Sequence, residues 1–181
     1  MQILDVCFGF SNVLADINDE YGIFKIRPGA MELLSEIHNR GHKITLWTTK
    51  KRGFISLLEQ TEKHFFKQFD KIYCMGDVEV FEDIPGNSVH HFKNINKIGV
   101  GCLIDSKPAY KKYAECLNIG DKYFILDKYR DCLYKQPTSW QIRVVDEDAL
   151  EKYHKRLKEQ ENWVYDVLHF IEKLETNAIS I

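Results

Sequence analysis

Short apolar segments alternate along this chain with segments whose apolar residues recur every three or four positions. The apolar segments are rich in branched and aromatic side chains, which predicts buried β-strands. They cover residues 3–10, 42–48, 71–75, 100–104 and 123–126. The segments between them follow the helical period, which predicts amphipathic helices over residues 30–40, 53–69 and 109–117.

Strands that alternate with helices predict an α/β domain. We expect a doubly wound, mostly parallel sheet of five or six strands with helices on both faces, because crossover connections are right-handed. Residues 17–25 and 76–86 are predicted loops. Further along, residues 140–145 predict one more strand, and residues 146–160 and 162–174 predict helices. We therefore expect one domain over residues 1–181, with a core at about 2–126 and a C-terminal helical extension at about 146–176.

The composition narrows the function classes without selecting one. The chain has 181 residues, of which 44% are hydrophobic and 29% charged, as in an ordinary packed domain. A net charge of −2 gives no overall attraction to nucleic acid or to an anionic membrane. We expect no secretion signal and no membrane span. Five cysteines without C-x-x-C spacing are typical of buried thiols in a reducing compartment, so a cytoplasmic location is predicted.

Polar residues follow several predicted strands, where parallel sheets place their ligands. In chain order, the candidate motifs are the turn at residues 11–14 after a strand, the segment 27–29 before a helix, the segment 48–50 after a strand, Lys93 before a strand, and Asp105 at the end of that strand. Together they resemble the haloacid dehalogenase (HAD) superfamily of phosphohydrolases, in particular its small members without a large cap domain. The resemblance covers roughly residues 2–126 and implies a Rossmann-like fold.

The first strand departs most from that family. In HAD enzymes it ends in D-x-D-G-T/V-L, where the first aspartate attacks phosphorus and the second acts as general acid and base. With Val13 and Leu14 aligned to the end of this pattern, Gly9 stands at the nucleophile position, Ser11 at the acid–base position and Asn12 at the usual glycine. Glycine has no attacking atom, so the resemblance implies that phosphatase activity by this route is lost.

A second register keeps a nucleophile. It assigns that role to Asp5, the only carboxylate inside the strand, and puts Cys7 where the second aspartate belongs. This register leaves a short strand before Asp5 and gives residues 8–12 no role. In the alternative interpretation Asp5 is a polar residue at the start of the strand, and Cys7 belongs to the core.

Two further motifs of the resemblance would bind a phosphoryl group. Thr48 follows an apolar strand, as the family's Ser or Thr does, and Thr49 precedes a helix whose free N–H groups favour anions. The family also uses a lysine here. The segment around Lys93 resembles the corresponding segment of small capless members, so we prefer Lys93 to Lys97. The alternatives are a plain strand-to-helix turn and solvated surface lysines.

The last motif normally supplies two acidic residues that help to hold Mg²⁺. Here it is Asp105-Ser106, so one carboxylate is left. Magnesium is usually held by one or two carboxylates with waters and substrate phosphate, so Asp105 alone predicts weak metal binding. In the alternative that we prefer, Asp105 pairs with Lys93 or Lys107 or caps the following helix.

Three hypotheses follow. In the first, the chain is a pseudoenzyme that needs no cofactor and binds phosphate, or a phosphate-containing ligand, with Ser11, Thr48, Thr49 and Lys93. In the second, it is a Mg²⁺-dependent phosphatase using Asp5 and Asp105. In the third, it is a scaffold for a protein partner, with a vestigial cleft.

Weaker candidates are the adjacent histidines 90 and 91, which cannot easily share a metal, and the acidic segment 77–83, which predicts a solvated loop.

Overall fold

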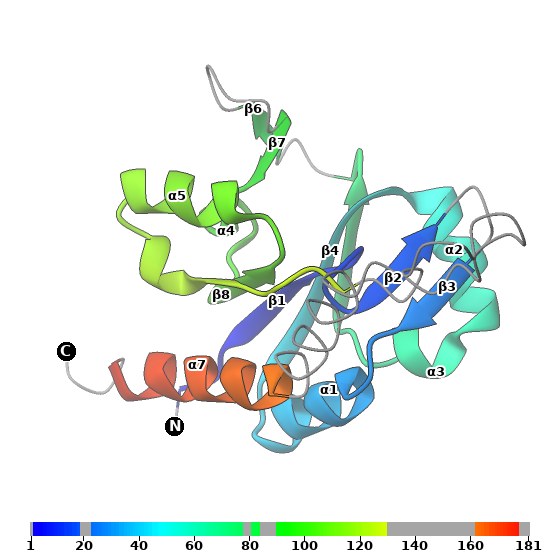
Figure 1. Ribbon diagram of the computed structural model, residues 1–181, viewed down its shortest axis with the longest axis horizontal. Helices are drawn as coiled ribbons and strands as arrows, with labels where there is room; N and C mark the ends of the chain where they lie inside the picture. The colour runs from blue at the N-terminus through cyan, green and yellow to red at the C-terminus, as the bar shows by residue number, and fades with distance from the viewer. Residues whose placement is uncertain (1, 19–22, 78–80, 84–89, 130–161, 178–181) are drawn as a thin grey trace, which may run out of the picture.

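The computed structural model describes residues 2–18, 23–77, 81–83, 90–129 and 162–177. Its main sheet has five parallel strands in the order β5-β4-β1-β8-β9. The strands are β1 (Asp5–Gly9), β4 (Lys43–Lys51), β5 (Lys71–Met75), β8 (Cys102–Asp105) and β9 (Tyr123–Ile125). The chain winds outward from the central β1 in both directions, which confirms the doubly wound α/β fold (Figure 1).

Helices cover both faces of this sheet, and Figure 1 shows α4 and α5 on one side with α1 and α7 on the other. Val6 and Phe8 of β1 belong to one buried cluster, and Cys7 between them belongs to a second. This alternation is the period of a strand whose two faces are both packed. The first cluster includes residues of α1 (Ala30–Asn39), α2 (Arg52–Thr61), α3 (Lys63–Phe66) and α7 (Trp163–Asn177); the second includes residues of α4 (Ile95–Ile98) and α5 (Pro108–Cys116). A short 3₁₀ helix, η1 (Gly120–Lys122), precedes β9.

Each of two segments predicted as loops contains at least one strand of an antiparallel hairpin. Residues 17–25 overlap β2 (Ala15–Asn18) and β3 (Ile23–Ile26), and residues 76–86 include β6 (Phe81–Asp83), which pairs with β7 (His90–Lys93). These predictions were wrong because strands of three or four residues are too short for an alternating pattern to stand out. In the first hairpin, Ile17 and Phe24 pack against the core.

One predicted helix is divided. The structure separates α2 from α3 at Glu62, whose backbone (φ −113°, ψ 43°) leaves the helical region. The apolar spacing continues through this break, so hydrophobic periodicity alone does not reveal it. Among the described helices, none is both long and apolar enough to cross a membrane.

The C-terminal helix α7 confirms the helix predicted over residues 162–174, and it is anchored at the turn before α1. Trp163 Nε1 donates a hydrogen bond to the carbonyl oxygen of Pro28 at 2.9 Å, and the Arg27 guanidinium lies 4.4 Å from the Trp163 ring centroid. Gly29 has φ +81°, and a Cβ there would lie 2.8 Å from Val164 Cγ2, so the turn requires glycine. The predicted strand 140–145 and helix 146–160 lie outside the described residues.

Candidate functional site

A buried ion pair lies at the carboxyl edge of the sheet, between the ends of β7 and β8. Lys93 Nζ donates a hydrogen bond to Asp105 Oδ2 at 2.7 Å and another to the carbonyl oxygen of Trp47 at 2.6 Å. The side chains of Lys93 and Asp105 are each 5% exposed. The second carboxylate oxygen, Oδ1, accepts a hydrogen bond from the backbone N–H of Ser106 at 2.7 Å. Asp105 therefore pairs with Lys93, one of the partners that the sequence left open, and both its oxygens have partners within the protein.

The carboxylate of Asp105 fills the space above Gly9. The β1–β8 register pairs Phe8 with Ile104, which brings the next residue of each strand side by side. A Cβ built on Gly9 would lie 2.5 Å from Asp105 Oδ2, 2.9 Å from its Cγ and 3.1 Å from Val13 Cγ2. Since real Cβ contacts are essentially never shorter than 3.0 Å, any larger residue at position 9 must displace Asp105. The ion pair therefore occupies the space into which a side chain at position 9 would extend.

The turn after β1 brings Ser11 to the same edge. The carbonyl oxygen of Phe10 accepts hydrogen bonds from the N–H groups of Val13 and Leu14, at 3.3 and 3.1 Å, which closes the turn. Asn12 has φ 64°, a left-handed conformation that glycine and asparagine tolerate best, in agreement with its alignment to the family's glycine. Ser11 Oγ is buried and has no hydrogen-bond partner among the described residues. A ligand that bonded this hydroxyl would remove the cost of its desolvation.

Thr48 and Thr49 stand at the end of β4, where its pairing with β5 becomes irregular between Trp47 and Lys51. The Thr48 side chain is buried, and its Oγ1 accepts a hydrogen bond from the backbone N–H of Lys50 at 3.1 Å. A hydroxyl that accepts in this way keeps its own proton for a second partner. The structure therefore holds Thr48 in a position to donate to a ligand.

These residues line one pocket of about 320 Å³. Its lining consists of Phe10, Ser11, Asn12, Ile17, Thr48, Thr49, Lys50, Lys93, Asp105, Ser106, Lys107 and Lys128. The structure thus brings together the predicted residues Ser11, Thr48, Thr49, Lys93 and Asp105. Four lysines and one carboxylate are among the described lining residues, so the pocket is strongly cationic.

Sequence reasoning did not assign Lys50 or Lys128 to the site, and it considered Lys107 only as a partner of Asp105. A signal was present, because each of these lysines stands at or just beyond the end of a strand. Lys50 is near the end of β4, Lys107 follows β8 and Lys128 follows β9. The carboxyl ends of parallel strands meet at one edge. Applied to every strand, that rule finds all three.

Asp5 lies at the opposite end of β1 from this pocket. Its Oδ1 accepts a hydrogen bond from Thr45 Oγ1 at 2.6 Å, and its Oδ2 lies 3.8 Å from Lys71 Nζ. Gly9, four residues further along the strand, stands beside Asp105, so the strand rise places Asp5 about 13 Å from that edge. The structure does not bring Asp5 and Asp105 together.

Other candidates fall outside the pocket. Lys97 is exposed and is not among the lining residues, which favours Lys93 for the lysine motif. Burial raises the pKa of the Cys7 thiol well above its usual value, so Cys7 remains a neutral core residue. Asp77, in the acidic segment, pairs with Arg52. The side chains of the two adjacent histidines lie outside the described residues.

The described lining fits Mg²⁺ poorly. Asp105 is its single carboxylate, one oxygen of which is bonded to an ammonium group and the other to a backbone N–H. Magnesium would have to displace the Lys93 ammonium and share the site with neighbouring lysines. Elsewhere among the described residues, no group of three or more His, Cys, Asp or Glu side chains forms a metal site.

Comparison with known proteins gives a similarity of structure and none of sequence. No family model matches the chain, and the curated proteins contain no match. Among solved structures, it is similar to the fission yeast RNA polymerase II CTD phosphatase Fcp1, with a TM-score of 0.50 and 11% identity over 94% of this chain and 56% of that one.

Two further structures have lower scores. A HAD-superfamily hydrolase from Ehrlichia chaffeensis has a TM-score of 0.44 and 14% identity, over 64% of this chain and 85% of that one. A Thermotoga maritima protein assigned as a beta-phosphoglucomutase has a TM-score of 0.48 and 13% identity, over 71% and 88%. The fold defines an α/β protein built on one parallel sheet. More narrowly, it is the HAD-like fold expected from the sequence, and at 11% identity the similarity to Fcp1 extends to the fold alone.

Proposed function

We propose that this chain is a non-catalytic HAD-like protein that binds the phosphate group of a ligand, without a metal ion, in the pocket at the carboxyl edge of its sheet. One observation carries the proposal. The Asp105 carboxylate, paired with Lys93, takes the space above Gly9 in which a nucleophile would stand. Among its described lining residues, the pocket has hydrogen-bond donors and cations but no carboxylate that is free to attack phosphorus.

The loss of the nucleophile has a large chemical consequence. The aspartyl-phosphate route needs an attacking oxygen, and removing the nucleophile from a well-built enzyme site lowers turnover by a factor on the order of 10⁶. Asp105 is a poor substitute because both of its oxygens are bonded within the protein and it is buried against Lys93. We therefore expect no phosphatase turnover above background.

The groups that remain are suited to an anion. Ser11 contributes a buried hydroxyl whose oxygen has no partner among the described residues, and Thr48 contributes a hydroxyl that retains its proton. Lysines surround them in the lining. Hydrogen bonds from cations and oriented hydroxyls to phosphate are among the stronger ones in proteins. A dianionic phosphate balances this charge, whereas Mg²⁺ adds to it.

The test combines thermal stability with turnover on the full chain. Inorganic phosphate should raise the melting temperature in the presence of EDTA, and Mg²⁺ alone should not. Thr48→Val should weaken phosphate binding by about tenfold, since it removes one hydrogen-bond donor to a charged group. Thr61→Val, which changes an exposed threonine on α2 outside the pocket, is the matched control and should bind phosphate normally.

Turnover of p-nitrophenyl phosphate with Mg²⁺ provides the opposing outcome. Robust hydrolysis, abolished by Asp5→Asn or Asp105→Asn, would overturn the proposal in favour of an active phosphatase. Hydrolysis that survives both substitutions would indicate a contaminating enzyme. The change in melting temperature with phosphate would then decide whether the pocket binds phosphate. If phosphate stabilises neither the original chain nor the Thr61→Val variant, the pocket is not a phosphate site.

A further inference from the structure

Three of the pocket's four lysines, Lys50, Lys107 and Lys128, lie outside the ion pair at its base. Lys93 and Asp105 bind each other and are almost fully buried, so most of their charge is balanced internally. Lys107 and Lys128 also line the pocket, and no described lining residue other than Asp105 carries a negative charge. The attraction that a ligand experiences therefore depends chiefly on lysines outside the family's motif.

Lys107 is held in place at the start of α5. Its Nζ donates a hydrogen bond to the phenol oxygen of Tyr110 at 3.1 Å and lies 5.1 Å from the centroid of that ring. Burial raises the pKa of Tyr110, so the phenol is a neutral partner that does not balance the ammonium charge. Burial also lowers the pKa of Lys107; Asp105 opposes this effect, and the charges of Lys93 and Lys128 add to it. Neighbouring cations that repel one another in this way favour a bound anion.

Lys128 is attached to the pocket through its backbone neighbours. Arg27 Nη1 donates a hydrogen bond to the carbonyl oxygen of Asp127 at 3.4 Å, and the N–H of Tyr129 donates to the carbonyl oxygen of Asn12 at 2.8 Å. Asn12 itself lines the pocket. Lys128 lies between these two attachments, so its backbone is fixed beside the turn that also positions Ser11. An exposed lysine on a fixed backbone can reach a ligand at the pocket's opening.

We infer that the ligand carries two linked anionic groups, as a diphosphate or a bisphosphate does, and that Lys107 and Lys128 bind the second group. This inference rests on the proposed function, which places the first phosphate at Ser11 and Thr48. The pocket's volume of about 320 Å³ is at the lower end of the range of about 300–1,000 Å³ for ligand pockets. Two small anionic groups suit that volume better than a large organic ligand.

The experiment compares inorganic phosphate with inorganic pyrophosphate by titration calorimetry in EDTA. The original chain should bind pyrophosphate at least about tenfold more tightly than phosphate, because two more charge-assisted hydrogen bonds form. Lys107→Met combined with Lys128→Met should remove this preference, because it should weaken pyrophosphate binding about tenfold more than it weakens phosphate binding. Thr48→Val should weaken both ligands to a similar extent.

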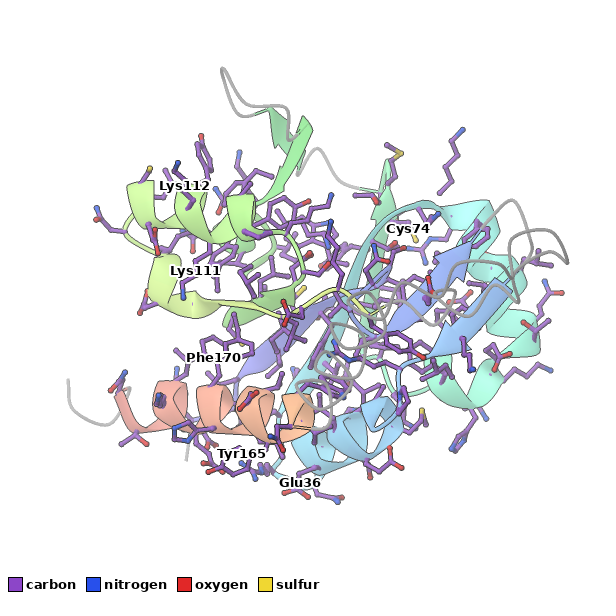
Figure 2. The ribbon with its side chains drawn as sticks, viewed as in Figure 1. Glu36, Cys74, Lys111, Lys112, Tyr165 and Phe170 are labelled. Carbon is purple, nitrogen blue, oxygen red and sulfur yellow. The ribbon has the colours of Figure 1, made fainter. Side chains whose placement is uncertain are left out.

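The matched control removes two lysines from the same helix outside the pocket. Lys111 and Lys112 lie on α5 (Figure 2), and both are exposed and absent from the lining. Lys111→Met with Lys112→Met should keep the preference for pyrophosphate. If this control loses the preference for pyrophosphate to the same extent, the preference comes from overall charge and not from a second subsite, and the inference fails.

The remaining outcomes distinguish a failure of this inference from a failure of the proposed function. Phosphate binding without a preference for pyrophosphate overturns the second subsite and leaves the proposed function standing. Binding of neither ligand overturns both. Circular dichroism of each variant checks that it is folded, and single Lys128→Gln, at an exposed position, replaces the double variant if the latter does not fold. In that single variant, the ratio of pyrophosphate affinity to phosphate affinity should fall by at least about threefold.

Discussion

Two aspartate–lysine pairs of this protein lie at opposite edges of the same sheet. At the amino edge, Asp5 and Lys71 are 3.8 Å apart, with side chains 15% and 51% exposed. At the carboxyl edge, Asp105 and Lys93 are 2.7 Å apart, and each is 5% exposed. Water screens the first pair, whereas in the second pair each charge is stabilised by the opposite charge and by a backbone hydrogen bond in place of water. The same two residue types therefore play different roles.

The difference also explains why a carboxylate in a strand is not by itself a catalytic signal. Asp5 has a hydroxyl partner and a lysine 3.8 Å away, and it is not among the residues that line the described pocket. Asp105 lies in the pocket but is committed to Lys93 and to the N–H of Ser106. Neither is placed as an attacking group.

The largest expected effect comes from breaking the buried pair. Asp105→Asn leaves the Lys93 ammonium buried among other lysines, and we expect the free energy of unfolding to fall by about 3–5 kcal/mol. Urea denaturation measures this loss. Lys93→Met should cost less, because Lys107 remains near the carboxylate that is left.

Anions sharpen this prediction. A sulfate or phosphate ion can take the place of the missing carboxylate, so it should stabilise Asp105→Asn more than it stabilises the original chain. A loss below about 1 kcal/mol, within the range of exposed pairs, would show that burial does not make the Lys93–Asp105 pair more important for stability than the Asp5–Lys71 pair.

An intermediate effect is expected at Gly9. The Cβ of Gly9→Ala would press on the Asp105 carboxylate and on Val13, and overpacking of this kind costs about 1–3 kcal/mol. Gly53→Ala is the matched control: a Cβ there meets nothing within 4 Å, and the residue lies in α2, so this change should raise stability by about 0.4–1 kcal/mol. Thermal denaturation of both variants checks the contrast. Equal stability of the two variants would mean that Asp105 moves aside freely.

The smallest effect is expected at the exposed pair. Lys71→Met should change the free energy of unfolding by about 0–1 kcal/mol, because surface ion pairs are screened by solvent and Lys71 is half exposed. The change should diminish further as salt is raised. A loss approaching that of Lys93→Met would remove the distinction between the two pairs.

Much of the architecture was accessible from the sequence, because it depends on patterns within single segments. The strand at Lys71–Met75 has the predicted bounds, and β1, β4, β8 and β9 lie within a few residues of theirs. Hairpins of three- and four-residue strands were missed, since their pairing partners, and not their own patterns, make them strands. The break between α2 and α3 was missed because the apolar spacing runs through it.

Some features of the candidate site could likewise be predicted from the sequence, and others could not. The order of the motifs, the glycine at position 9 and the single acid at Asp105 follow from the chain read one residue at a time, as does the absence of an attacking atom on glycine. The tertiary structure decided which lysine meets Asp105, that the carboxylate lies over Gly9, and that Lys107 and Lys128 share one pocket. The physical reason is that composition and periodicity act locally, whereas a carboxylate's partner is set by distances of a few ångströms between residues far apart in the chain.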